Sequence, residues 1–562
     1  MEINERKQLL KKRILPTLLI SLIIPIMLCV CIPFEIYANN SQEFLFSMAD
    51  FLPICILIGF VIAIILFFAI FFLPEKLYKI ACAVIISFSV MFFVQSLYLN
   101  AGLKSLVGDT LETNELSTGK KFGNLIIWIF IIAGAIVLSI LKDKKGYISI
   151  VGIILSVVVI ITQIMTPVSL MISKPEVLKS KVNGKSGELI DYGILTTKNL
   201  TNISTSNNIF YFFIDKFDGR FAEQTYESKP EVFSELTGFT WFKDHVSRYS
   251  HTYPSVSTML TRNEYDPTKS RAEFLEDVYA EDDTLSVLHE NGYEINLYTE
   301  EFYVYDKAEH LPEFVNNVSL KSNYKINNRF KLSARMIQMA LYRVVPLFFK
   351  NLVGGITSSV CNSYIDLIDP ENNSLYSSDL DDTYNVIKET GFKKIDEKQF
   401  TFIHVQGCHD VEPDMDCIPT MEKNFKIINE YIKAMKEYGV YEDATIVITG
   451  DHATAYGGYQ QTTALMVKPS GVSTGEMAVS MAQTSHDNIW ATIMKSENIV
   501  TGNDYGKSVF EIVEGENQTR YYSWHTWNEK LVEYNYTITG AARDLSKWEL
   551  TSTREFDKTL MD

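Results

Sequence analysis

The stretch Ile446–His452 reads Ile-Val-Ile-Thr-Gly-Asp-His, an apolar run that ends abruptly in an acid and a histidine. A continuous apolar run of this length is typical of a β-strand buried on both faces of a sheet. Similar runs occupy residues 209–214, 293–298 and 400–405, and helical patterns such as Met421–Tyr438 lie between them. Alternating strands and helices predict a doubly wound α/β sheet, whose ligand site forms at the carboxyl ends of the strands.

Apolar segments dominate the chain before residue 175, and five of them are long enough to cross a membrane. Basic residues cluster at the N-terminus and in the turns after the second and fourth segments. The loop Glu35–Asp50 has no Lys or Arg, although the loop 100–124 has three. The positive-inside rule therefore predicts a cytoplasmic N-terminus and an extracytoplasmic chain after about residue 172. The five segments are Ile14–Phe34, Phe51–Leu73, Leu77–Leu97, Leu125–Leu141 and Ile148–Leu170.

The rest of the chain divides by composition. Residues 173–207 are polar and without periodicity, which is typical of a linker. Two late stretches, Tyr521–Trp527 and Leu531–Ile538, are rich in aromatic and β-branched residues and predict strands of a small appended β element. The predicted domains are a five-helix transmembrane region at 1–172, a linker at 173–207, an α/β catalytic domain at 208–515 and a β-rich element at 516–562.

Charge argues against a nucleic-acid-binding protein, and cysteine content argues against a disulfide-rich protein. The formal net charge is −17, whereas binding to nucleic acid requires basic patches. Only three of the seven cysteines, Cys361, Cys408 and Cys417, follow the apolar segments, so a dense disulfide framework is excluded. A disulfide bond between Cys408 and Cys417, which would close a short loop, is one alternative.

Acidic residues and a histidine stand at two predicted strand ends. Asp215 follows the run 209–214, where a carboxylate can hold a divalent cation, although Asp and Gly also form ordinary turns. Asp451 and His452 are adjacent after their strand and can both reach one cation. Their alternative interpretation is a surface turn.

A hydroxyl and three histidines complete the set of candidates. Thr252 opens a helix-like stretch, Val256–Leu260, where free backbone N–H groups favour a phosphate; it could also be a plain helix cap. His404 and His409 end the run that begins at 400, and histidines there can bind phosphoryl oxygens, move protons or ligate a second metal. His486, before an apolar helix, is a weaker candidate of the same kind. All three could equally be structural histidines.

Together these motifs resemble the alkaline phosphatase and sulfatase superfamily. Within it the chain looks most like bacterial membrane transferases: lipoteichoic acid synthases, phosphoglycerol transferases and lipid A phosphoethanolamine transferases. Thr252–Arg262 resembles the sulfatase nucleophile signature, Ile448–His452 the late metal motif, and Ile403–His409 the two-histidine motif of the phosphoethanolamine transferases. The resemblance covers the five-span layout and most of residues 208–500.

The resemblance implies a metal-dependent site with a threonine nucleophile. Asp215, Thr252, Asp451 and His452 would surround one divalent cation, Zn²⁺ or Mn²⁺. His409 and His404 would contact the substrate phosphate, and we add His486 to these predicted substrate contacts.

Departures from the family patterns disfavour two of the reactions that the family catalyses. Several of these transferases have Glu where this chain has Asp215, and the stretch Tyr459–Thr463 lacks the histidine usual in phosphoethanolamine transferases. Sulfatases carry Cys or Ser as the nucleophile precursor and usually Arg four positions later, where this chain has Thr252 and Val256. Phosphoethanolamine transfer and sulfate ester cleavage are therefore disfavoured.

We accordingly expect a cell-membrane, multi-pass transferase that takes a head group from a phospholipid donor. Its reaction would pass glycerol phosphate from phosphatidylglycerol, through a phosphothreonine intermediate, to a cell-surface glycan or polymer. The alternatives are an extracytoplasmic phosphodiesterase or phosphatase, in which water replaces the acceptor, and a non-catalytic membrane assembly factor on the same fold.

Overall fold

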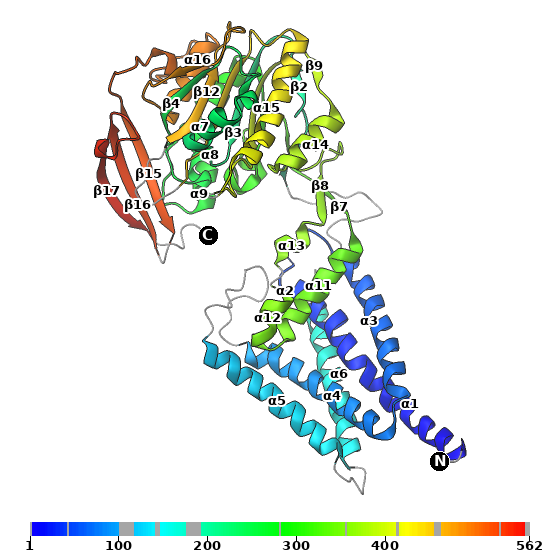
Figure 1. Ribbon diagram of the computed structural model, residues 1–562. Helices are drawn as coiled ribbons and strands as arrows, with labels where there is room; N and C mark the ends of the chain where they lie inside the picture. Colours follow the sequence, from blue (N-terminus) through cyan, green and yellow to red (C-terminus); the bar gives the residue numbers. More distant parts are fainter. Residues whose placement is uncertain are drawn as a thin grey trace. The chain divides into compact units, whose positions relative to one another are not determined.

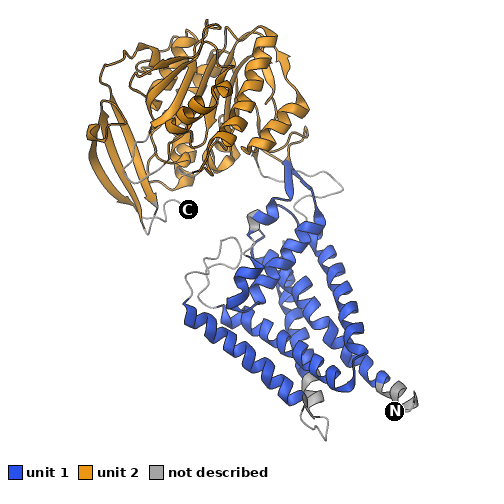
Figure 2. Ribbon diagram, in the orientation of Figure 1, with its two compact units in different colours: residues 1–190, 323–367 blue, residues 191–322, 368–562 orange. Residues whose placement is uncertain are grey.

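The chain folds into two compact units (Figure 2). Unit 1 comprises residues 1–190 and 323–367, and unit 2 comprises residues 191–322 and 368–562. The computed structural model describes residues 3–41, 44–100, 117–140, 147–175, 193–279, 283–354, 357–411, 415–454, 462–527 and 530–556.

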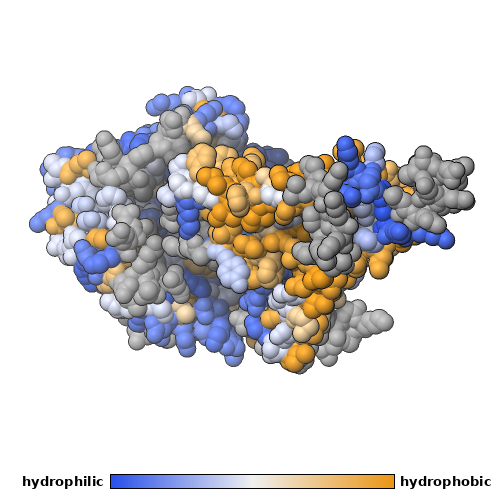
Figure 3. Space-filling model, turned by 90° about the horizontal axis from the view of Figure 1, so that it is seen from below, coloured by the Kyte–Doolittle hydropathy of each residue, from blue (hydrophilic) through white to orange (hydrophobic). Residues whose placement is uncertain are grey.

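Long apolar helices form the body of unit 1. Within the described residues, five helical segments are long and apolar enough to cross a membrane, which confirms the five predicted segments. Many of their side chains are exposed, including Phe60, Phe68 and Phe130, and Figure 3 shows a broad apolar area on the surface. Exposed apolar surface on this scale is typical of contact with lipid. The helices are α1 (Ile3–Ile26), which continues through a π-turn into α2 (Ile32–Asn39), α3 (Met48–Phe71), α4 (Glu75–Val94), α5 (Thr118–Ile140) and α6 (Tyr147–Ser173).

Residues 323–367 form an insertion that belongs to unit 1, although the sequence predicted one uninterrupted domain from 208 to 515. Its main helix, α11 (Arg329–Val344), packs against α3. The side chain of Arg329 lies 3.2 Å from Asp50, and that of Arg343 lies 2.7 Å from Glu35. The helix interrupts the predicted domain because its partners are on the apolar helices. The remaining elements of the insertion are β7 (Asn323–Ile326), α12 (Lys350–Val353), α13 (Ser358–Asn362) and β8 (Ile365–Ile368).

Unit 2 is built on an eight-stranded sheet with the order β13-β4-β12-β11-β3-β10-β5, in which β14 also pairs with β4 (Figure 1). β12 is antiparallel to both of its neighbours, and the other strand pairs are parallel. The central strand β3 is buried along its whole length, as its continuous apolar run predicted. The strands are β3 (Asn208–Ile214), β4 (Thr240–Val246), β5 (Tyr293–Tyr298), β10 (Lys398–Val405), β11 (Thr445–Gly450), β12 (Thr462–Lys468), β13 (Ala478–Ser480) and β14 (Thr484–Ser485).

Helices cover both faces of this sheet, which confirms the doubly wound α/β architecture. Alternate residues of β3 enter two different cores: Ile209, Tyr211 and Phe213 pack on one face, and Phe210 and Phe212 on the other. This alternation explains why β3 is apolar throughout residues 209–214. The first core holds α8 (Thr252–Thr261), α9 (Arg271–Asp277), α10 (Leu285–Glu290) and α16 (Ile489–Ser496); the second holds α7 (Gly219–Ser228), α14 (Leu380–Thr390) and α15 (Ile418–Tyr438).

Unit 2 also begins and ends with strands outside the large sheet. β1 (Ile194–Leu195) and β2 (Asn202–Ser204) are paired within residues that we predicted as linker, so the folded unit begins earlier than the sequence indicated. The C-terminal element is a three-stranded antiparallel sheet of β15 (Thr519–Trp527), β16 (Leu531–Thr539) and β17 (Trp548–Phe556). Its first two strands match the predicted stretches, and its third was not predicted.

Candidate metal centre and nucleophile

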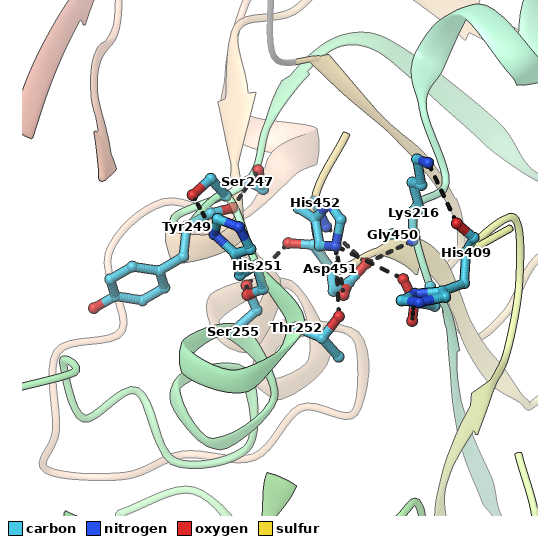
Figure 4. A network of polar contacts seen from close by, with 12 residues as sticks. Lys216, Ser247, Tyr249, His251, Thr252, Ser255, His409, Gly450, Asp451 and His452 are labelled. Carbon is cyan, nitrogen blue, oxygen red and sulfur yellow. Dashed lines mark hydrogen bonds and ion pairs between the residues drawn. The ribbon is translucent and has the colours of Figure 1, made fainter. Parts of the chain in front are cut away.

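Three neighbouring parallel strands, β11, β3 and β10, bring the candidate residues to one edge of the sheet. Asp215 directly follows β3, Asp451 and His452 follow β11, and His409 lies four residues after β10. Figure 4 shows Asp451, His452 and Thr252 converging, with His409 beside them. Residues far apart in the sequence therefore form one cluster, as the strand-end rule predicted.

Asp215, Asp451 and His452 form the centre of this cluster. One ligand atom from each lies within 4.8 Å of the other two. His452 Nε2 lies 3.7 Å from Asp215 Oδ1 and 3.4 Å from Asp451 Oδ2. The Nδ1 atom of His452 donates to the Ala453 carbonyl oxygen at 2.7 Å, which leaves Nε2 with a free lone pair in the neutral ring.

The cluster fits a divalent cation. Asp215 Oδ1 and Asp451 Oδ2 are buried and have no hydrogen-bond partner among the described residues. A buried carboxylate oxygen without a partner is costly, and a bound cation would remove that cost. Two carboxylates and one imidazole also supply three protein ligands, the number with which a catalytic zinc site keeps a fourth position open for a further ligand.

The two carboxyl groups differ in acidity because they share a buried site. Burial raises the pKa of Asp451 to about 6. Burial acts in the same direction on Asp215, but its hydrogen bond with His409 and the nearby histidines outweigh it and lower the pKa of that group. Two neighbouring carboxylates repel each other when both are ionised. A divalent cation bound between them would offset this repulsion.

Thr252 stands at the first turn of α8, and its hydroxyl faces the cluster. Thr252 Oγ1 lies 3.4 Å from His452 Nε2. The ten residues of α8 are all buried, so the helix start is held firmly against the sheet. The positive end of the helix dipole and the free N–H groups of this turn favour a bound phosphate. The position therefore suits a nucleophile that attacks phosphorus.

His409 occupies the open side of the cluster. Its Nδ1 lies 3.2 Å from Asp215 Oδ2, and its side chain is 57% exposed. The hydrogen bond with Asp215 raises the pKa of His409 to about 9. A half-exposed, positively charged ring is well placed to meet a phosphate that enters from solvent.

Gly407 and Lys216 hold this arrangement, and sequence reasoning assigned a role to neither. A Cβ on Gly407, whose φ is +62°, would lie 2.1 Å from the Asp215 carbonyl oxygen, so no other residue fits there. The backbone N–H of Lys216 donates to Asp451 Oδ1 at 2.8 Å. A glycine two residues after the end of β10 was the signal that could have revealed the close approach.

His404 is fully buried and close enough to Asp215 to influence its charge. Its Nδ1 shares a 2.9 Å hydrogen bond with the hydroxyl of Thr299, and its ring packs against Phe213 and Tyr303. Burial lowers the pKa of His404. These contacts suit a neutral ring that packs within the core next to the site.

His486 differs from its predicted role as a substrate contact. Its Nε2 donates to the Gly450 carbonyl oxygen at 2.9 Å, and its Nδ1 accepts from the Arg248 N–H at 3.3 Å. Both ring nitrogens are therefore used within the protein and neither is left for a substrate. The ring instead stabilises the end of β11, the strand that Asp451 follows. Cys408 and Cys417 are likewise both free, so the disulfide alternative is not realised.

Acid should destabilise unit 2 partly through His486. Burial lowers the pKa of His486 to about 3 from its ordinary 6.5. The unfolded chain therefore binds the proton first, and stability that is present above pH 6.5 is lost as the pH falls towards 3, at up to about 1.4 kcal/mol per pH unit. His486→Gln, which keeps a donor for Gly450, should reduce this slope in urea unfolding followed by tryptophan fluorescence. His289→Gln, at an exposed histidine, is the control; equal slopes in all three proteins would contradict this role.

No protein-family model and no curated protein matches the chain. The chain is similar to solved structures of sulfatases and a lipoteichoic acid synthase. Sulfatases and lipoteichoic acid synthases are among the proteins that the sequence motifs resemble. Identities this low say nothing about the reaction of the chain itself.

Three of these structures illustrate the similarity. The PsFucS1 sulfatase from Pseudoalteromonas sp. is 12% identical, with 63% of this chain and 84% of that one covered and a TM-score of 0.37. The lipoteichoic acid synthase LtaP from Listeria monocytogenes is 11% identical, with 63% and 87% covered and a TM-score of 0.33. The phosphonate monoester hydrolase SpPMH from Silicibacter pomeroyi is 14% identical, with 63% and 89% covered and a TM-score of 0.36.

Proposed function

We propose that this protein is a metal-dependent transferase of the alkaline phosphatase and sulfatase type. It takes glycerol phosphate from phosphatidylglycerol and passes it to a cell-surface glycan or polymer. The observation that carries the proposal is the position of Thr252, whose hydroxyl lies 3.4 Å from His452 beside a buried pair of carboxylates.

The cluster supplies the electrostatic part of the reaction. Asp215, Asp451 and His452, together with Thr252, would hold one Zn²⁺ or Mn²⁺, which when bound would lower the pKa of the threonine hydroxyl and offset charge on the substrate phosphate. The N–H groups at the start of α8 would also stabilise the phosphate oxygens.

Thr252 and His409 carry out the bond changes. Thr252 Oγ1 loses its proton to solvent and forms a bond to phosphorus, while the bond from phosphorus to the glyceride oxygen breaks. His409, whose Nδ1 is held by Asp215, gives a proton from Nε2 to that oxygen, and diacylglycerol leaves. In the second half, an acceptor hydroxyl attacks the phosphothreonine and gives its proton to His409, and the Thr252 oxygen regains a proton from solvent.

The apolar helices of unit 1 support a lipid donor. A donor confined to the membrane meets an anchored enzyme at high effective concentration, whereas a soluble donor gains nothing from five spans. The basic residues at the N-terminus favour a cytoplasmic start, so unit 2 would act outside the membrane.

Lipid cleavage in vesicles tests this function. The purified full-length protein is placed in phosphatidylglycerol vesicles with Mn²⁺ or Zn²⁺, and lipids and water-soluble products are identified by mass spectrometry. We expect diacylglycerol together with glycerol phosphate attached to an added glycan acceptor.

The other products would identify the alternatives. Diacylglycerol with free glycerol phosphate only, in the presence of acceptors, would indicate a phosphodiesterase. Cleavage of another phospholipid alone would keep the mechanism and change the donor. No cleavage of any lipid would overturn the lipid-donor proposal.

A further inference from the structure

A pocket of about 470 Å³ lies in unit 2 between the chain before the nucleophile and the C-terminal sheet. Tyr249 and Tyr265 line one wall, and Tyr521 and Tyr536 line the wall formed by β15 and β16. Asn535 of β16 also lines the pocket. Several aromatic rings beside amide and hydroxyl groups are a lining that suits a ligand with both apolar C–H faces and hydroxyls.

Hydrogen bonds tie this pocket to the nucleophile. Tyr249 forms a parallel bridge with Ser523 of β15, and the Ser250 N–H donates to the Ser523 carbonyl oxygen at 3.1 Å. The His525 N–H donates to the Ser250 hydroxyl at 3.0 Å. Tyr249 precedes Thr252 by three residues, so their Cα atoms are at most about 11 Å apart. Figure 4 shows the ring of Tyr249 pointing away from the cluster, towards the other side of this short segment.

The charges of the lining disfavour a polyanion. Arg248 is hydrogen-bonded to Glu264, and the Arg554 Nε lies 3.6 Å from Glu533. Two arginines thus face three carboxylates, the third being Asp266, and the lining has a net negative charge. An anionic polymer needs basic groups that are not already neutralised. A neutral, hydroxyl-rich ligand meets no such repulsion and can use the paired groups as hydrogen-bond partners.

We propose that this pocket binds a neutral sugar of the acceptor, and that the C-terminal sheet is the acceptor-recognition element of the enzyme. The proposal rests on the proposed function and adds the chemical class of the acceptor. A saccharide seated against Tyr521 would lie beside the segment Tyr249–Thr252, which joins the pocket to the nucleophile. One sugar of the acceptor would be recognised there, while another part of the same acceptor chain attacks the phosphothreonine.

Direct binding measures the pocket separately from catalysis. The full-length protein in detergent, without phospholipid donor, is titrated with maltose, cellobiose, gentiobiose and a glycerol phosphate oligomer, and binding is followed by saturation-transfer NMR. Tyr521→Ala removes an exposed ring face, Tyr521→Phe keeps it, and Tyr534→Ala removes a ring of β16 that does not line the pocket. A diglucosyl lipid in nanodiscs is then compared with the free disaccharides as a competitor, to tell a glycolipid head group from a free glycan.

We expect at least one neutral disaccharide to bind the wild type. Loss of the stacking face in Tyr521→Ala should weaken that binding by about 3- to 10-fold, whereas Tyr521→Phe and Tyr534→Ala should bind as the wild type does. Binding of the phosphate oligomer alone, no sugar binding, or equal weakening by Tyr534→Ala would each overturn the proposal. Sugar binding without lipid cleavage would contradict the proposed lipid donor but not the sugar-binding pocket. A failure of the proposed function can therefore be told from a failure of the pocket proposal.

Discussion

Thr252→Ala is expected to lower the rate of diacylglycerol release by at least about 10³-fold, because in the proposed mechanism this residue forms the covalent bond to phosphorus, and removing a catalytic nucleophile leaves only binding and electrostatic stabilisation. The measurement is diacylglycerol release from phosphatidylglycerol vesicles by mass spectrometry. Brief incubation of the wild type, followed by quenching in acid and peptide mapping, should also show the added mass of glycerol phosphate on the peptide that contains Thr252.

Thr252→Ser is the matched control, since it keeps the hydroxyl and loses one methyl group. It should retain measurable turnover. Thr252→Ala should still bind the cation, because Asp215, Asp451 and His452 remain. If the alanine variant kept a tenth or more of the wild-type rate, Thr252 would not be the nucleophile.

Asp451→Asn should abolish the response of the protein to a divalent cation. Asparagine keeps the size of the side chain, and its oxygen can still accept from the N–H groups of Lys216 and His452, which bond to Asp451 Oδ1 at 2.8 Å. The charge that faces Asp215 is lost. We expect cation affinity to fall by roughly 100-fold or more, since even groups outside the coordination shell are worth 10–100-fold.

Stability measurements give a readout that does not depend on turnover. The wild type should gain about 2.7 kcal/mol of unfolding free energy at a cation concentration 100 times its Kd, and Asp451→Asn should gain almost none. Without cation the variant should be at least as stable as the wild type, because a buried charge and its repulsion with Asp215 are gone. Asp410→Asn, an exposed carboxylate next to His409, serves as the control. Equal stabilisation of wild type and Asp451→Asn by Mn²⁺ and by Zn²⁺ would show that the cluster is not the metal site.

The sequence was most informative where the pattern of apolar residues in a segment matches the position of that segment in the sheet. The runs that became β3, β10 and β11 are mostly apolar because both faces of each strand are buried over nearly the whole length, so their type and ends could be predicted. Asp215, Asp451 and His452 stand directly after such strands, and the strand-end rule brings them together without knowledge of the register.

Contacts between distant segments could not be predicted in the same way. Whether the nitrogens of His486 face a substrate or the backbone depends on Gly450 and Arg248, which lie far from it in sequence. The reversed direction of β12 depends on how the chain returns to the sheet, and no residue within the strand encodes it. The membership of residues 323–367 in unit 1 depends likewise on ion pairs with Asp50 and Glu35, hundreds of residues earlier.

That insertion has a consequence for how the enzyme could be lost from the cell. The chain passes between the two units at residues 190–191, 322–323 and 367–368. An ectodomain joined to its anchor by one linker can be shed by a single proteolytic cut. Here all three connections must be cleaved, and unit 2 would then leave as two separate chains, 191–322 and 368–562. A protease that cuts one of these connections therefore leaves unit 2 attached to unit 1.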